Sequence, residues 1–284
     1  MTKGAGEALG SGARIAWRSE GPLEAGAPGD PVLMIMGLGA SSRLWYRLLP
    51  SIRQRHRAIL MDNRGTGDSS RVRSRLTMRD MAEDARAVLD DAEVDSAHVV
   101  GASMGGMIAQ HLALDHPDRV DSLVLACTTP GGRSGAPPWR LLAASALRPV
   151  LGPTRTFPLV APLLYARSTL TERPDRVRED LERRIEDNTP ARTVYAQMGA
   201  IAKHDTRARL GELAGTPTLV LHGLEDNLVS PEHGRKLAEL IPGARRVLIP
   251  SCGHLLSTDA EERTASAILD HLERAAAAAP SSLG

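Results

Sequence analysis

The sequence contains few cysteines, few aromatic residues and almost no net charge. It has two cysteines among 284 residues, with three tryptophans, three tyrosines and one phenylalanine. Two cysteines in a chain of this length do not form a disulfide framework, so we expect reduced thiols. So few aromatic side chains argue against a base-stacking platform for nucleic acid. The 35 basic and 34 acidic side chains leave a formal charge of +1, which gives no electrostatic basis for binding nucleic acid or an anionic membrane.

Long apolar runs are also missing. The first residues, "MTKGAGEALGSG", lack the apolar run of a signal peptide, and no segment approaches the ~20 apolar residues that span a bilayer. We therefore expect a cytoplasmic protein with no membrane partner, either a monomer or a homodimer. With 42% hydrophobic residues, the chain is long enough for one large α/β domain with an insertion, or for two smaller domains.

Short apolar segments alternate with helical patterns over most of the chain. Continuous runs such as "PVLMIM" and "RAILM" predict strands buried on both faces of a mostly parallel sheet, and "ARIAWRSEG" predicts an edge strand. A helical pattern runs from Ser42 to about Arg53. In "TMRDMAEDARAVLDD", Thr77 is a candidate N-cap with Asp80 three residues later. The alternation predicts an α/β fold with helices on both faces of the sheet.

The alternation stops in the middle of the chain and then resumes. Residues 130–210 contain proline-punctuated apolar pieces and a charged helix, "DRVREDLERRIEDN". We interpret 130–210 as a helical insertion over one edge of the sheet, and 13–129 with 211–275 as the core. Residues 1–12 and 276–284, rich in glycine and alanine, are expected to be flexible tails.

The segment "VVGASMGGMIAQ" places Ser103 between a predicted strand and a predicted helix. It matches G-x-S-x-G, in which a serine occupies the tip of a sharp strand-to-helix turn. Such a turn strains the serine backbone and brings residues two before and two after so close that a Cβ would clash, which explains Gly101 and Gly105. The start of the helix offers free N–H groups to a developing oxyanion. The pattern therefore predicts that Ser103 is a nucleophile.

A serine nucleophile needs a base, and His254 is the best candidate among nine histidines. It follows the predicted strand "ARRVLIP" through "SCG", so it lies at the edge where open α/β sheets place their sites. Six other histidines occupy strands, helices or polar surroundings and are interpreted as structural or solvated: His56, His98, His111, His116, His204 and His271. Cys252, two residues before His254, is interpreted as a small buried side chain.

The loop "VLHGLEDNLVSP" offers two carboxylates, Glu225 and Asp226, that could orient the histidine. The segment after the strand ending near Cys127 reads "TTPGG" and offers none, which favours this loop. His222 and His233 flank the loop and make a metal site conceivable. The spacing typical of zinc ligands is missing, so we expect no metal and no cofactor.

Taken together, "MGLG", "DNRGTGDSS", "GASMGG", "HGLED" and "CGH" resemble the α/β-hydrolase superfamily, in particular its capped esterases, lactonases and perhydrolases. The resemblance covers nearly the whole chain outside the insertion and implies eight strands and a helical cap. It implies a triad of Ser103, Asp226 and His254, with Asp226 preferred to Glu225 because the family acid stands four residues after the histidine of the "HG" step.

The resemblance also implies an oxyanion hole made by the backbone N–H groups of Leu38 and Met104. Most relatives have His-Gly where this chain has Met36-Gly37, although backbone donors survive that change. The "DNRGTGDSS" loop, with Asp62, Arg64 and Gly67, is interpreted as a structural scaffold.

The insertion is expected to control access to Ser103. An apolar face under a lid is typical of a pocket for hydrophobic groups. The candidate substrate contacts are Trp139, Phe157, Tyr165, Tyr195 and Met198. Glu179–Arg183 and Asp180–Arg184 are interpreted as i,i+4 pairs of a solvated helix.

These features predict hydrolysis of a carboxylic ester or lactone of a hydrophobic small molecule through an acyl-enzyme. The alternative keeps the same three side chains for C–C bond hydrolysis, perhydrolysis or acyl transfer in natural-product metabolism. Dehalogenase and epoxide hydrolase activities are disfavoured because their nucleophile is an aspartate. A third hypothesis is a non-catalytic ligand receptor, which would leave Ser103 unreactive towards an organophosphonate.

Overall fold

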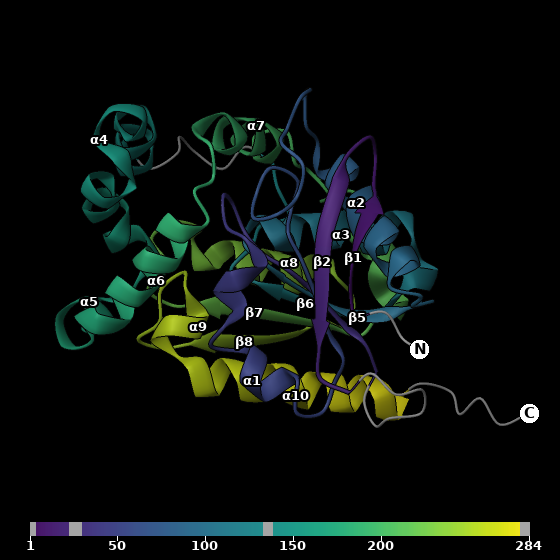
Figure 1. Cartoon of the computed structure of the whole chain (residues 1–284). Helices are drawn as coiled ribbons and strands as arrows, with labels where there is room; N and C mark the ends of the chain where they lie inside the picture. Colours follow the sequence, from purple (N-terminus) through teal and green to yellow (C-terminus); the bar gives the residue numbers. More distant parts are fainter. Residues whose placement is uncertain (1–3, 23–29, 133–138, 279–284) are drawn as a thin grey trace, which may run out of the picture.

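The computed structural model describes residues 4–22, 30–132 and 139–278. In these residues eight strands form one sheet in the order β1-β2-β4-β3-β5-β6-β7-β8 (Figure 1). β1 and β2 are antiparallel to their neighbours, and the remaining six strands run parallel. The strands are β1 (Ala5–Leu9), β2 (Arg14–Glu20), β3 (Val32–Ile35), β4 (Ala58–Met61), β5 (Ala97–Ala102), β6 (Val120–Ala126), β7 (Thr218–Gly223) and β8 (Arg245–Ile249).

Helices cover both faces of this sheet, as the alternating pattern predicts. One face packs against α2 (Met78–Asp91), α3 (Met104–Asp115) and α8 (Pro231–Leu240). The other packs against α1 (Leu49–Ile52), α9 (Leu256–Asp259) and α10 (Glu261–Ala278), with α1 and α10 along the lower side in Figure 1. Every residue of β3 and β4 is buried, because neighbouring side chains point into two different cores.

The predicted start of α2 is confirmed. The Thr77 hydroxyl accepts a hydrogen bond from the Asp80 N–H at 3.1 Å, and the Asp80 carboxylate accepts one from the Thr77 N–H at 2.9 Å. This reciprocal pair satisfies two backbone donors at the helix end and contributes about 1 kcal/mol.

Four helices separate β6 from β7 in the chain: α4 (Trp139–Leu164), α5 (Arg167–Glu172), α6 (Pro174–Glu186) and α7 (Ala191–Ile201). In Figure 1, α4, α5 and α6 lie to the left of the sheet and α7 lies above it. Gly152, with φ 75°, divides α4 into two helical pieces. Three short 3₁₀ turns complete the described elements: Ser42–Trp45, Pro117–Arg119 and Leu210–Gly215.

Three expectations about local structure are wrong. Ala5–Leu9 is not a flexible tail but strand β1, held because Ala8 and Ile15 are buried where it pairs with β2, so β2 is not an edge strand. Ser42 to Arg53 forms a 3₁₀ turn and then α1, because Pro50 lacks the N–H that a continuous helix needs. The expected C-terminal tail begins too early: α10 continues to Ala278, and residues 279–284 lie outside the described chain.

None of the helices in the described ranges combines the length and the apolar character that crossing a bilayer requires.

Candidate active site

Ser103 occupies a strained turn between β5 and α3. Its backbone angles are φ 56° and ψ −119°, a region that residues with a Cβ rarely adopt. A Cβ on Gly101 would lie 2.5 Å from the Gly105 carbonyl oxygen, and one on Gly105 would overlap the carbonyl oxygen of Ile35. The predicted clash is therefore present at both glycines, but at Gly105 the neighbour is strand β3 and not the turn itself. The turn is held by hydrogen bonds from the Ser103 N–H to the Ala126 carbonyl at 2.8 Å and from the Thr128 hydroxyl to the Ser103 carbonyl at 2.7 Å.

The loops after β7 and β8 bring Asp226 and His254 together. Nδ1 of His254 donates a hydrogen bond to Oδ2 of Asp226 at 2.7 Å, which fixes the imidazole tautomer with its proton on Nδ1. Oδ1 of Asp226 accepts the backbone N–H groups of Leu228 and Val229, both at 2.9 Å. Burial alone raises the pKa of Asp226, but the two histidines beside it outweigh that effect and hold the pKa below its usual value. Asp226 is therefore ionised at neutral pH.

Glu225, the other carboxylate of this loop, lies elsewhere. Its Oε2 accepts a hydrogen bond from the backbone N–H of Arg167 at 3.1 Å. It therefore holds the start of α5, and it is Asp226 that contacts the imidazole of His254.

A second histidine, His222, contacts the same carboxylate. Its Nε2 lies 3.2 Å from Oδ2 of Asp226 and 2.9 Å from the carbonyl oxygen of Val229. A carbonyl oxygen only accepts hydrogen bonds, so Nε2 carries the proton. His222 is fully buried. From the sequence, His222 is interpreted only as a possible metal ligand, although its position in the "HG" step, four residues before Asp226, is a usable signal of this contact.

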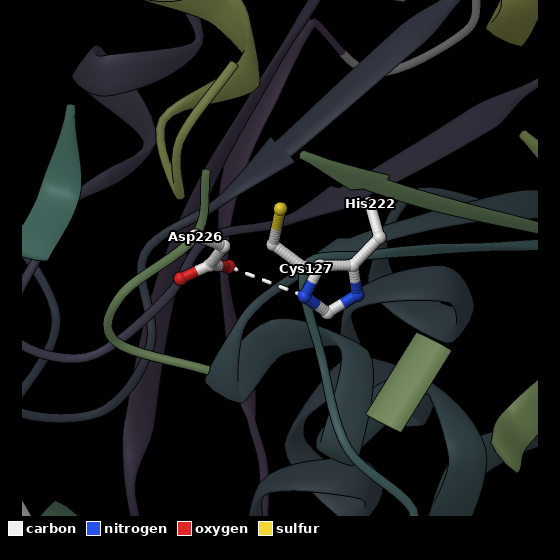
Figure 2. A group of neighbouring side chains, drawn as sticks. All are labelled: Cys127, His222 and Asp226. Atoms are coloured by element: carbon white, nitrogen blue, oxygen red, sulfur yellow. Dashed lines mark ion pairs between the residues drawn. The ribbon is translucent and has the colours of Figure 1, made fainter. Parts of the chain in front are cut away.

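Cys127, His222 and Asp226 form the one candidate metal-binding group among the described residues (Figure 2). The Cys127 thiol, Nε2 of His222 and the Asp226 carboxylate are already protonated or hydrogen-bonded, and only Nδ1 of His222 has no hydrogen-bond partner in the described part of the chain. Burial raises the pKa of the Cys127 thiol, His222 donates through Nε2, and Asp226 accepts from His254. These contacts favour a hydrogen-bonded cluster over a metal site, because a metal needs deprotonated ligands.

The loop after β3 lies beside Ser103. A Cβ on Gly37 would lie 3.1 Å from the Cβ of Ser103, so only glycine allows this approach without a shift. The backbone N–H groups of Leu38 and Met104 donate to no acceptor among the described residues. Both remain available to an oxyanion. From the insertion, Gln197 Oε1 accepts the Gly39 N–H at 2.8 Å.

The "DNRGTGDSS" loop holds neighbouring segments of the core in place through its Asp62 and Arg64 side chains. Asp62 accepts the backbone N–H groups of Ser42 at 2.8 Å and Asp68 at 3.0 Å. The Arg64 guanidinium forms a buried ion pair with Asp84 of α2, with Nε 2.6 Å from Oδ2. These contacts agree with the interpretation of the loop as a scaffold.

Ser103 and His254 line a cavity of about 210 Å³ together with residues of the insertion. Two of the five predicted substrate contacts, Phe157 and Tyr195, lie in its wall. Trp139 is 66% exposed, with the Arg140 guanidinium over its ring. Tyr165 is buried in the packing of the insertion, where its hydroxyl donates to Asp180 at 3.0 Å. Met198 belongs to α7 and is not among the described wall residues.

The interpretation of Asp180–Arg184 as a solvated ion pair is wrong. Asp180 is buried and accepts hydrogen bonds from the hydroxyls of Tyr46 at 2.7 Å, Tyr165 at 3.0 Å and Thr258 at 2.7 Å. Arg184 faces the cavity instead. The helical spacing of Val177, Asp180, Leu181 and Arg184 was the signal that this stripe of α6 points inward.

The remaining histidines make structural contacts. His98 Nδ1 lies 2.9 Å from the Ser122 hydroxyl, and His116 Nε2 lies 2.6 Å from Glu83. His111 and His204 stack edge to face. Burial lowers the pKa of both His204 and His271 to about 4, so both are neutral at physiological pH.

Residues 30–261 match the sequence profile of the family described as "alpha/beta hydrolase fold". "Putative carbamate hydrolase RutD" of Variovorax paradoxus is 32% identical over 88% of this chain and 94% of its own length. A thermophilic esterase from Thermogutta terrifontis is 25% identical with a TM-score of 0.82, covering 95% of this chain and 98% of that one. Est816, described as an N-acyl homoserine lactone degrading enzyme, is 27% identical with a TM-score of 0.78, covering 93% and 99%.

Proposed function

Because the chain belongs to the α/β-hydrolase family, we propose that it is a serine hydrolase acting on a carboxylic ester or lactone of a hydrophobic small molecule. Ser103 is the nucleophile, His254 the base and Asp226 the orienting acid. One observation carries this proposal. The imidazole of His254, hydrogen-bonded at 2.7 Å to Asp226, lines the same cavity as the strained Ser103.

In the first step, Nε2 of His254 takes the proton of the Ser103 hydroxyl as Oγ attacks the substrate carbonyl. The ionised Asp226 stabilises the imidazolium that forms. The backbone N–H groups of Leu38 and Met104 stabilise the oxyanion. His254 then protonates the leaving oxygen, and an ester links Ser103 to the acyl group.

In the second step, His254 takes a proton from water, and the resulting hydroxide attacks the acyl-enzyme. Collapse of the second tetrahedral intermediate releases the acid and returns the proton to Ser103. The set of groups is the same in both steps, so one imidazole serves in turn as base and acid.

Residues 130–210 act as the cap over residues 13–129 and 211–275, which form the catalytic core. The cap limits the substrate to molecules with apolar parts. Its contribution to the cavity wall includes Phe157, Val160 and Tyr195, and the core adds Leu44 and Val100. Burial of these surfaces against an apolar substrate supplies the binding free energy.

The relatives support this substrate class, because one is named an esterase and another a lactone-degrading enzyme. A carbamate is the second candidate, favoured by the 32% identical relative. The carbonyl carbon of a carbamate would be attacked by Ser103 in the same way, and the leaving group would be a nitrogen or an oxygen.

The test combines turnover with covalent labelling. We expect cleavage of p-nitrophenyl esters to rise with acyl chain length, and Ser103→Ala to lower kcat by about 10⁴–10⁶-fold. A fluorophosphonate probe should label the wild type but not Ser103→Ala. Ser257 is another serine of the cavity wall, and the control variant Ser257→Ala should still be labelled. Turnover retained by Ser103→Ala would refute the mechanism. Identification of the reaction products would distinguish ester cleavage from C–C bond hydrolysis and from acyl transfer.

A further inference from the structure

Two arginines face the cavity from different helices of the insertion. Arg148 belongs to α4 and Arg184 to α6, and both line the same cavity as Ser103. Most of the surrounding wall is apolar, including Leu141, Val160, Leu181 and Val194. Both arginines are half-buried, and two partly desolvated guanidinium groups are unusual in an apolar wall, because withdrawing a charge from water is costly unless the charge is paired.

Neither arginine is paired within the described chain. No carboxylate there lies within 4 Å of the Arg148 or Arg184 guanidinium, and the buried Nε of Arg184 has no hydrogen-bond partner. Neighbouring arginines of the same region do have carboxylate partners. Arg47 lies 2.8 Å from Glu179, and Arg183 lies 3.5 Å from the same side chain.

Asp180, the acid one helical turn before Arg184, is already occupied. Three hydroxyl groups donate to its carboxylate, and Nε of Arg47 lies 3.6 Å away. Its negative charge is therefore balanced by Arg47 and by these hydrogen bonds. Asp180 also lines the cavity, but its carboxylate forms no ion pair with Arg184, which faces the cavity without a partner of its own among the described residues.

The two arginines also act on each other. Burial lowers the pKa of Arg148, and the positive charge of Arg184 lowers it further. Two like charges held near each other in an apolar wall destabilise the empty protein. Such an arrangement becomes favourable when an anion binds between or against the two groups.

We propose that Arg148 and Arg184 form a subsite for a carboxylate of the substrate, separate from the ester or lactone carbonyl that Ser103 attacks. The inference rests on the proposed function, which it narrows to hydrophobic esters or lactones carrying a free carboxylate. A carboxylate presents two oxygens to the guanidinium fork. A dianionic phosphate is less suited to this apolar wall because its desolvation costs more.

The first test compares matched substrates that differ only in charge. The anionic members are mono-p-nitrophenyl esters of glutaric, adipic and suberic acid, and each neutral twin carries a methyl ester at the far end. We expect wild-type kcat/KM to favour the anionic member by ~10-fold or more for at least one chain length, as for a hydrogen bond to a charged group. Arg184→Gln and Arg148→Gln should bring this ratio towards one.

The ratio is the readout, so a general loss of activity does not count as support. Arg178→Gln in α6 and Arg155→Gln in α4 are the matched controls, because both arginines are exposed. They should keep the wild-type ratio. A wild-type ratio near one at every chain length, with the neutral esters cleaved, would overturn the carboxylate subsite and leave the proposed function intact.

A binding measurement separates the two proposals if no ester is cleaved. Calorimetry on Ser103→Ala would compare 6-phenylhexanoate with 6-phenylhexanol. Tighter binding of the carboxylate, lost on adding Arg184→Gln, would support the subsite even if the esterase proposal failed. Equal binding of both probes would overturn it, as would tighter binding of 6-phenylhexyl phosphate than of the carboxylate.

Discussion

His222 Nε2 lies 3.2 Å from Asp226 Oδ2, the same oxygen that accepts the hydrogen bond from His254. The carboxylate is thus held from two sides by imidazoles and from a third side by the backbone N–H groups of Leu228 and Val229. This arrangement fixes the carboxylate in one orientation. Under the proposed function, His222 is a positioning residue for the imidazole of His254, which lines the same cavity as Ser103.

Replacing His222 should therefore affect turnover more than substrate binding. His222→Phe keeps a ring of similar size but removes both nitrogens, leaving the Val229 carbonyl unsatisfied and one contact of Asp226 missing. We expect kcat to fall ~10-fold with KM nearly unchanged, the loss of one hydrogen bond to a charged group. The control is His233→Phe, which loses only a contact with Thr129. A folded His222→Phe protein with wild-type kcat would contradict this role.

Replacing the two adjacent acids of the same loop should have very different effects on kcat. Asp226→Asn removes the charge that stabilises the imidazolium and disturbs the tautomer of His254, so kcat should fall by about 10³–10⁴-fold. Glu225→Gln changes only a contact with the Arg167 backbone, so kcat should stay within ~3-fold of wild type. Equal losses in both variants, measured on one p-nitrophenyl ester, would argue against Asp226 as the orienting acid.

The glycines of the Ser103 turn should tolerate no side chain. Gly105→Ala places a Cβ against the Ile35 carbonyl, and because backbone cannot move aside cheaply we expect a loss of about 2–4 kcal/mol in the free energy of unfolding. Gly199→Ala in α7 is the control, since a Cβ there meets nothing within 4 Å. In this helix interior alanine should stabilise by about 0.5–1 kcal/mol. Urea denaturation measures both, and similar effects would contradict the steric argument.

Stability should fall as the pH drops from about 6.5 to 4. His204 and His271 have a pKa of about 4 in the folded state because they are buried, whereas a histidine in an unfolded chain titrates near 6.5. Between these values the unfolded state binds more protons, so acid favours unfolding, by up to about 3 kcal/mol for each group. His271→Gln should flatten this part of the stability–pH curve in urea titrations. An unchanged slope would show that the pKa of His271 is the same in the folded and unfolded states.

Features governed by neighbouring residues could be predicted from the sequence. The buried strands are marked by continuous apolar runs, and the Thr77–Asp80 cap and the approach of Gly101 to the Gly105 carbonyl depend on contacts within a few positions. The fold class followed from the alternation of these local patterns. The residues alone left Glu225 and Asp226 as alternatives, and the preference for Asp226 came from the resemblance to α/β-hydrolases.

Features governed by distant contacts could not be predicted from the sequence. Asp180 and Arg184 have the spacing of a surface ion pair, but Asp180 instead accepts hydrogen bonds from Tyr46 and Thr258, which lie far away in the chain. β1 has a glycine-rich and alanine-rich sequence with little strand propensity, and its pairing with β2 holds it in place. In both cases tertiary contacts override a local pattern.

The hydrogen bond from Gly39 to Gln197 has a consequence for protein engineering. It ties α7 to the segment that contains Leu38, and Asp187 makes a second tie by accepting the Ser41 N–H at 3.0 Å. Exchanging the whole insertion for that of another enzyme would thus disturb the geometry next to Ser103 as well as the shape of the binding site. A chimera that retains Gln197 and Asp187 can vary α4 to α6 while keeping these two anchors.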